Sequence, residues 1–108
     1  MMKNSFIALL VLAIFAMVFS TFSAAQAGGA DLFKSKCAMC HGPDGKGQTA
    51  MGKTLNLRDL GSADVQSQSD ADLTNIVTNG KGKMPKYDGK LTKDQIGDVV
   101  KYIRTLKR

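Results

Sequence analysis

The stretch CAMCH at residues 37–41 decides how the rest of the chain is interpreted. On an α-helix Cys37, Cys40 and His41 stand at positions i, i+3 and i+4, so their side chains are neighbours on one face. Two thiols placed in this way can form thioether bonds to two vinyl groups of one haem, and the adjacent imidazole can reach its iron. This pattern is the attachment motif for c-type haem. We therefore predict one covalently bound haem c, with Cys37 and Cys40 as thioether residues and His41 as an axial iron ligand.

The same five residues have two other interpretations. A structural or redox-active disulfide between Cys37 and Cys40 is compatible with an oxidising compartment, but the βαβ pattern that accompanies a thioredoxin-like C-x-x-C is missing from the sequence. A zinc site normally has four ligands. With two cysteines and one histidine, the chain would have to complete such a site with aspartates.

The second axial ligand separates electron transfer from ligand binding, because an iron with an open position binds external ligands. His41 is the only histidine, so a His/His pair cannot form within one chain. Met39 and Met51 are too close to His41 in sequence to cross to the opposite face of the haem. Met84 follows His41 by 43 residues, and we predict it as the second ligand.

The segment around Met84 fits this role. Residues 79–85 read NGKGKMP, and the glycines let the backbone approach a planar ligand closely. The proline biases Met84 toward an extended conformation, and a methionine in a polar loop has little core to fill. A neutral thioether favours ferrous iron, so a His/Met pair predicts a raised reduction potential.

Residues 1–27 have the three-part layout of a secretory signal peptide. Lys3 supplies a positive charge, an uncharged apolar run covers residues 6–19, and AQA at residues 25–27 is a cleavage site of small residues. The apolar run is shorter than the roughly 20 residues of a spanning helix, although an uncleaved signal would anchor the same domain to a membrane. We expect a cleaved signal and a mature mono-haem domain over residues 28–108, which does not span a membrane. Its compartment is the periplasm or another exported one, such as a thylakoid lumen.

Size and charge limit the partners. The 108 residues carry 15 Lys and Arg against nine acids, all Asp, for a net charge of +6. A mature domain of 81 residues buries little core without reinforcement, and a covalently attached haem would supply it. A basic surface attracts acidic proteins, anionic membranes or nucleic acid. Export argues against nucleic acid, and we expect a monomer that meets acidic redox partner proteins.

The remaining pattern predicts helices. Residues 30–40 can form a first helix, and Ser69 begins a second over about 70–79. Thr92 with Gln95 forms a capping box before a third helix. That helix carries apolar residues at helical spacing, namely Ile96, Val99, Val100, Ile103 and Leu106.

The segments between these helices give weaker signals. Residues 41–54 are rich in glycine and predict an extended loop, and a short helical turn near residues 57–60 is weakly indicated. The sequence shows no strand pattern of useful length. We therefore predict an all-α domain.

Taken together, these residues resemble the class I cytochrome c family, in its small exported bacterial and algal forms, over essentially all of residues 28–108. The family places a glycine, an aromatic residue and the first haem cysteine four residues apart, as at Gly29, Phe33 and Cys37. It has an aromatic residue on the last helix at the position of Tyr102, where the two helices cross. The resemblance implies the small cytochrome c fold, with three to four helices wrapped around one covalently bound haem.

One departure from the family pattern follows the attachment motif. Family members usually have Gly-Pro before the second helix, and the proline carbonyl accepts a hydrogen bond from the axial imidazole. The best match here is Gly52-Lys53. Because the hydrogen bond does not need the proline ring, we expect the Lys53 carbonyl to be able to serve.

The predicted function is to carry single electrons from a quinol-oxidising complex to an oxidase or reaction centre. We expect no enzymatic activity, because the sequence shows no acid/base pair or nucleophile elsewhere. Two alternatives stay open: an electron-entry subunit of a larger oxidoreductase, and a haem protein that binds ligands after Met84 is displaced. Six lysines near the expected haem rim either form an ordinary solvated surface or steer acidic partners; they are Lys36, Lys46, Lys53, Lys81, Lys83 and Lys86.

Overall fold

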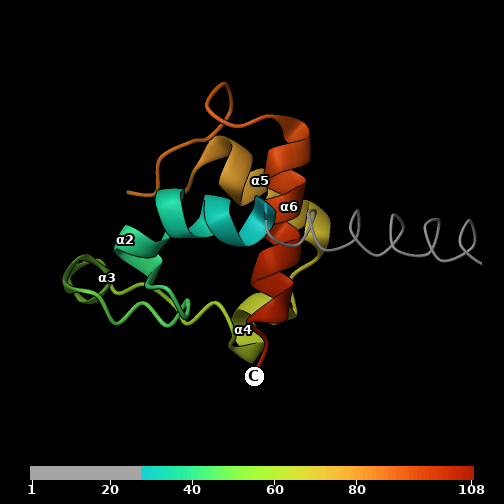
Figure 1. Ribbon diagram of the computed structural model, residues 1–108. Coiled ribbons are helices and arrows are strands. Elements are labelled where there is room, and N and C mark those ends of the chain that lie inside the picture. Colours follow the sequence, from blue (N-terminus) through green and yellow to red (C-terminus); the bar gives the residue numbers. More distant parts are fainter. Residues whose placement is uncertain (1–27) are drawn as a thin grey trace, which may run out of the picture.

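The computed structural model describes residues 28–108, so the predicted signal peptide over residues 1–27 lies outside the described residues. The described part is helical, and its only β-type pairs are two isolated bridges. The longer helices are residues 28–36, α5 (Asp70–Asn79) and α6 (Lys93–Thr105) (Figure 1). Between the first of these and α5 lie three single-turn helices, α2 (Ala38–His41), α3 (Ala50–Thr54) and α4 (Ala63–Gln66). The all-α prediction is confirmed.

The helices α5 and α6 begin at the capping residues that the sequence indicates. The Ser69 hydroxyl accepts a hydrogen bond of 3.0 Å from the Asp72 N–H. At α6 the capping box is complete, because the Gln95 N–H donates to the Thr92 hydroxyl at 3.1 Å and the Thr92 N–H donates to the Gln95 side chain at 2.9 Å. These bonds satisfy amide groups that the first turn of a helix leaves without partners.

Two local predictions are wrong. Part of the segment predicted as an extended loop forms α3, because the Thr49 hydroxyl caps this short helix. The turn expected near residues 57–60 does not form, and α4 follows instead. The amides of Leu57 and Leu60 donate to Gly52 and Gly45, at 2.9 and 2.8 Å, and these longer-range bonds replace those of a helical turn.

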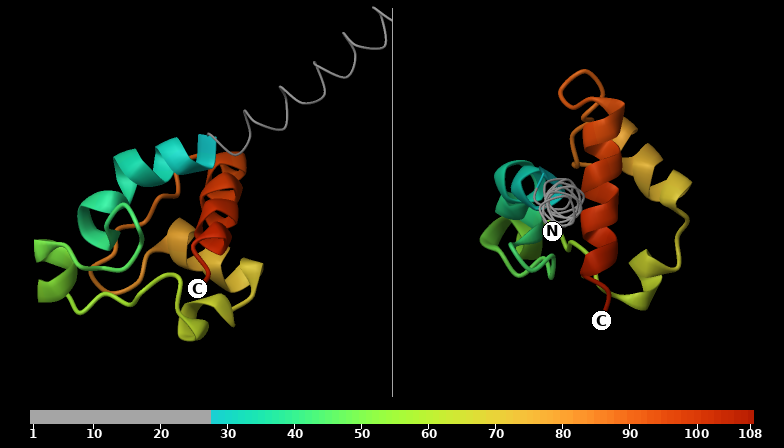
Figure 2. Two further views of the ribbon diagram at one scale, coloured as in Figure 1. Left: turned by 60° about the horizontal axis from the view of Figure 1, so that its bottom comes forward. Right: turned by 45° about the vertical axis from the view of Figure 1, so that its right-hand side comes forward.

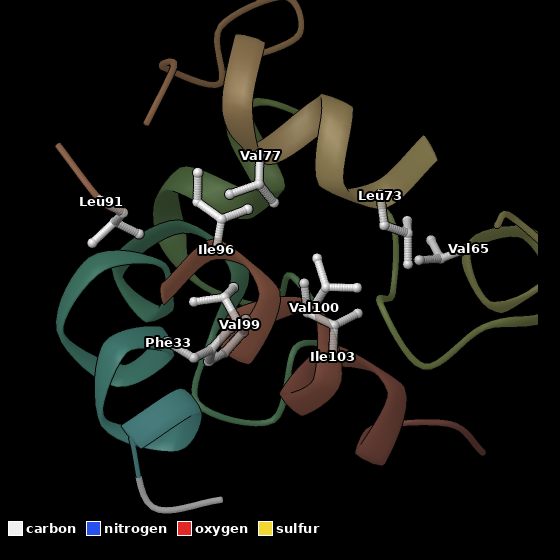
Figure 3. Packing of buried hydrophobic residues seen from close by; sticks show 9 residues of the cluster. All are labelled: Phe33, Val65, Leu73, Val77, Leu91, Ile96, Val99, Val100 and Ile103. Carbon is white, nitrogen blue, oxygen red and sulfur yellow. The ribbon is translucent and has the colours of Figure 1, made fainter. Parts of the chain in front are cut away.

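The hydrophobic core lies around α6. In Figure 3, side chains from α6 meet those of α5 on one side and Phe33 of the first helix on the other. Burial of one such side chain contributes roughly 1.5–3 kcal/mol, so the apolar stripe of α6 is the surface on which the other elements assemble. The buried hydrophobic residues are Phe33, Val65, Leu73, Val77, Leu91, Ile96, Val99, Val100 and Ile103.

The first helix crosses α6, as the views in Figure 2 show. At the crossing, a Cβ on Gly29 would overlap the Asp98 carbonyl, so only glycine permits the observed approach. The approach brings the rings of Phe33 and Tyr102 into contact, with centroids 5.0 Å apart. The predicted crossing of these residues is therefore present, and it fixes the helix that leads into residues 37–41.

Candidate haem site

The attachment segment, residues 37–41, begins where the first helix breaks. The Cys37 N–H donates to the Phe33 carbonyl at 2.8 Å, as in a continuous helix. The Cys40 N–H, however, donates to the Cys37 carbonyl at 3.2 Å instead of reaching back to Lys36. The chain tightens at Cys37, and the Lys36 carbonyl is released from the helical hydrogen-bond ladder.

Cys37 and Cys40 are both free thiols and both partly buried. Burial, with a smaller contribution from Cys40, raises the pKa of Cys37 to about 11. Reactive C-x-x-C thiols have a lowered pKa, because the thiolate is the nucleophile in disulfide exchange. The environment of Cys37 is therefore opposite to that of a redox-active dithiol.

His41 lies at the end of α2, with its ring centroid 6.5 Å from that of Phe33. Burial lowers the pKa of the imidazole below its usual value, which keeps the ring neutral at pH 7. The neutral ring is the form that binds metal ions. Its Nδ1 atom is buried and has no hydrogen-bond partner within residues 28–108. Buried polar atoms are nearly always paired, so this imidazole has bonding capacity that residues 28–108 leave unused.

The expected contact between the Lys53 carbonyl and the imidazole is not formed. Lys53 lies in the last turn of α3, and its carbonyl accepts the N–H groups of Leu55 and Asn56 that close this helix. The departure from the family's Gly-Pro therefore removes more than the proline ring. The Lys53 carbonyl is already hydrogen-bonded to the N–H groups that follow α3.

Thr49 fixes α2 to α3, and the sequence did not single it out. Its hydroxyl donates to the Cys40 carbonyl at 2.6 Å and accepts the Gly52 N–H at 2.8 Å. The second of these bonds is a helix N-cap, for which threonine is a preferred residue. This preference makes the N-cap at Thr49 predictable from the sequence. It gives no indication of the hydrogen bond to Cys40.

Met84 lies in the loop between α5 and α6. Met84 and Lys81 exchange two backbone hydrogen bonds of 3.0 and 3.2 Å, and Gly80 before this turn has a φ of +77°. The Met84 side chain is partly buried against the hydrophobic core. By contrast, Met39 is 83% exposed and Met51 is 49% exposed. Of the three candidate methionines, Met84 is the one packed into the domain.

Tyr87 joins the loop of Met84 to the residue that directly precedes the attachment segment. Its hydroxyl donates a hydrogen bond of 2.9 Å to the Lys36 carbonyl, 51 residues away in the sequence. Burial raises the pKa of Tyr87 above its usual value, and the thiols of Cys37 and Cys40 add to the effect. The phenol is therefore a hydrogen-bond donor at neutral pH.

Comparison with known proteins identifies the family to which the chain belongs. The family described as "Cytochrome C oxidase, cbb3-type, subunit III" matches residues 24–103. Cytochrome c6 of Gloeothece citriformis (strain PCC 7424) is 38% identical over 103 residues, which cover 93% of this chain and 88% of that protein. Cytochrome c6 of Nostoc sp. (strain PCC 7120) is 38% identical over 105 residues, which cover 94% of this chain and 92% of that protein. The chain belongs to the class I cytochrome c family.

The fold of this cytochrome also resembles a solved structure, the KustC0563 c-type cytochrome. The two superpose with a TM-score of 0.69 at 29% identity, over 74% of this chain and 98% of that one. The predicted small cytochrome c fold is confirmed. The cytochrome carries a covalently bound haem c and passes single electrons between redox partners.

The residues of the site have the chemistry that a haem c needs. Two free thiols stand three residues apart, a neutral imidazole follows directly, and one thioether packs against the core. Residues 28–108 contain no group of three or more His, Cys, Asp or Glu that could hold a metal ion. In the same range, no helix is long and apolar enough to cross a membrane.

Proposed function

We propose that this cytochrome is a diffusible electron carrier in which Cys37 and Cys40 hold the haem and His41 and Met84 are its axial iron ligands. The observation that carries the proposal is the packing of Met84 against the core, while Met39 and Met51 are exposed. An iron with both axial positions filled by side chains transfers electrons and has no open position for an external ligand.

The bound haem supplies a one-electron couple between ferric and ferrous iron. The protein contributes the rest through its own side chains. The His41 imidazole is neutral at pH 7, so its lone pair is available without loss of a proton. The Met84 thioether is uncharged and favours the ferrous state, which raises the reduction potential. Because both axial positions are occupied by the chain itself, we propose that the protein is a carrier and not an enzyme.

The partners that we propose are acidic redox proteins. The loop of Met84 carries Lys81, Lys83 and Lys86, all exposed, and positive charge beside the proposed iron ligand favours a negatively charged docking face on the partner. A quinol-oxidising complex would reduce the protein, and an oxidase or a reaction centre would oxidise it. We further propose a monomer, cleaved after residue 27, in the periplasm or another exported compartment such as a thylakoid lumen.

A dedicated electron-entry subunit is the second candidate. The match to the family described as subunit III of a cbb3-type cytochrome c oxidase favours it. Expression of the full chain with a C-terminal tag separates the two candidates. A carrier is recovered free of other haem proteins after mild membrane extraction, whereas a subunit co-purifies with its oxidase in fixed proportion.

Visible spectroscopy tests the axial ligands. The protein is matured with haem-attachment machinery, and spectra are recorded in the oxidised and the dithionite-reduced state, with and without carbon monoxide. We expect the wild type and the control Met51→Ala to show the long-wavelength iron–sulfur band and to be inert to carbon monoxide. Met84→Ala should lose the band and bind carbon monoxide. A high-spin wild type that binds carbon monoxide would instead establish a ligand-reactive haem protein.

A further inference from the structure

The loop of Met84 is tied to α5 by its backbone. The N–H groups of Tyr87 and Asp88 donate to the carbonyls of Val77 and Thr78 at 3.1 and 3.0 Å. These bonds fold the loop back onto the helix that precedes it. They do not connect Met84 to the attachment segment, which lies on a different part of the chain.

The side chain of Tyr87 makes that connection. Its hydroxyl reaches the Lys36 carbonyl at 2.9 Å. This carbonyl is available because the helix breaks at Cys37 and the Cys40 N–H turns to a different acceptor. In a continuous helix the same carbonyl would be occupied by the amide four residues later. The break in the helix therefore creates the acceptor that Tyr87 uses.

Both residues of this hydrogen bond lie close in the sequence to proposed haem-site residues. Lys36 directly precedes Cys37, and Tyr87 follows Met84 by three residues. The side chains of Met84 and Tyr87 are both partly buried against the same core. A movement that takes Met84 away from the attachment segment would pull on the hydrogen bond between Tyr87 and Lys36.

We propose that Tyr87 is a positioning residue that holds Met84 toward the attachment segment, and that its hydrogen bond to Lys36 controls how readily an external ligand replaces Met84 on the iron. The inference rests on the proposed His41/Met84 ligation. A single hydrogen bond of ordinary net strength corresponds to roughly a 2- to 10-fold change in an equilibrium constant. Loss of the Tyr87 hydroxyl should therefore raise the apparent affinity for an external ligand by roughly this factor.

Imidazole titration of the ferric holoprotein tests the proposal. Tyr87→Phe keeps the ring and removes the hydroxyl, and Tyr102→Phe makes the same change on α6, where the ring packs on Phe33. The loss of the iron–sulfur band reports replacement of Met84, and far-UV circular dichroism in denaturant reports global stability. We expect Tyr87→Phe to bind imidazole roughly 2- to 10-fold more tightly, with Tyr102→Phe close to wild type.

The outcomes distinguish the two proposals. A wild type without an iron–sulfur band overturns Met84 ligation itself. A wild type with the band, and equal imidazole affinity in Tyr87→Phe, overturns the role of Tyr87 even if the variant unfolds at lower denaturant. Native-state hydrogen exchange gives a second test. The Met84 amide, which donates to the Lys81 carbonyl, should exchange faster in Tyr87→Phe than in the wild type, and equal exchange of this amide in the two proteins would contradict the proposal.

Discussion

The backbone of Gly29 lies against the carbonyl group of Asp98, so closely that a Cβ at position 29 would overlap the carbonyl oxygen. The same Cβ would also lie 3.4 Å from the Cβ of Tyr102. This contact joins the first described helix to the last one. It sets how deeply Phe33 enters the core beside α6.

Gly29→Ala should destabilise the protein. The added methyl group has no space, and overpacking of this kind costs about 1–3 kcal/mol. Gly97 supplies a matched control, because a Cβ there meets nothing within 4 Å. Gly97→Ala in the interior of α6 should stabilise by about 0.5–1 kcal/mol through helix propensity. Denaturant unfolding of both holoproteins measures the difference, and a change of equal sign in the two variants would contradict the close contact.

We expect Arg104 to stabilise the protein mainly through its hydrogen bonds to backbone carbonyls, and less through its ion pair with Asp70. Its guanidinium donates to the carbonyls of Gln66 and Gln68 and to the carboxylate of Asp70, at 2.8 Å in the last case. Asp70 is 77% exposed, and such a surface pair contributes about 0–1 kcal/mol. Lysine cannot reproduce the forked contacts.

We therefore expect Arg104→Lys to lower the free energy of unfolding by about 1–2 kcal/mol, and Asp70→Asn by at most about 0.5 kcal/mol. Unfolding in urea at low and at high salt checks both values. The Arg104 effect should persist at high salt, because carbonyl acceptors are not screened as exposed charges are. Equal losses in the two variants would show that the ion pair is the dominant contact.

Thr49→Val should weaken the contact between α2 and α3 and so lower the stability of the protein. The substitution keeps the shape of the side chain and removes the hydroxyl that bonds to Cys40 and Gly52. Loss of the N-cap and of the second bond should cost about 1–2 kcal/mol. Thr49→Ser retains both bonds and should stay within about 0.5 kcal/mol of wild type. If thermal unfolding shows Thr49→Ser weakened and Thr49→Val close to wild type, the methyl group and not the hydroxyl holds the helices together.

Positive charge near Met84 should steer small charged reagents. Oxidation of the reduced protein by anionic ferricyanide should slow as ionic strength rises, and oxidation by a cationic cobalt–phenanthroline complex should accelerate, because salt screens exposed charges. Stopped-flow rates measure both. Lys81→Glu should reduce the salt dependence.

Lys107→Glu serves as the control for that charge reversal. Lys107 is exposed and lies just beyond the C-terminal end of α6. The 13 residues of α6 form a helix roughly 20 Å long, and the loop that contains Lys81 leads into its other end. Rates that do not depend on salt, or equal effects of Lys81→Glu and Lys107→Glu, would show that the lysines form only a solvated surface.

Local signals made much of the fold predictable. The stripe of α6 and the capping box of Thr92 and Gln95 depend on residues within about three turns of each other, so the sequence displays them directly. The attachment motif is equally local. The placement of Gly29 opposite Tyr102 follows only from resemblance to the family, because no spacing within one segment indicates which helices cross.

The parts that sequence reasoning missed depend on contacts between distant segments. The bond from Tyr87 to Lys36 spans 51 residues, and it uses a carbonyl that is free only because of a break in the helix. A different reason applies to the Lys53 carbonyl, which we expect to be able to meet His41: the N–H groups of Leu55 and Asn56, directly after α3, donate to it instead. α3 and α4 are single turns of helix, too short to produce a clear apolar period.

The crossing of the first helix with α6 also has a consequence for how the protein is made. Phe33 is covered by a ring that comes 69 residues later, so the core cannot close until nearly the entire polypeptide has been synthesised. Closing a loop of this length carries an entropic cost that local helix formation does not repay. Until the last helix arrives, Cys37 and Cys40 lie on an open chain, where an assembly factor can reach both sulfur atoms.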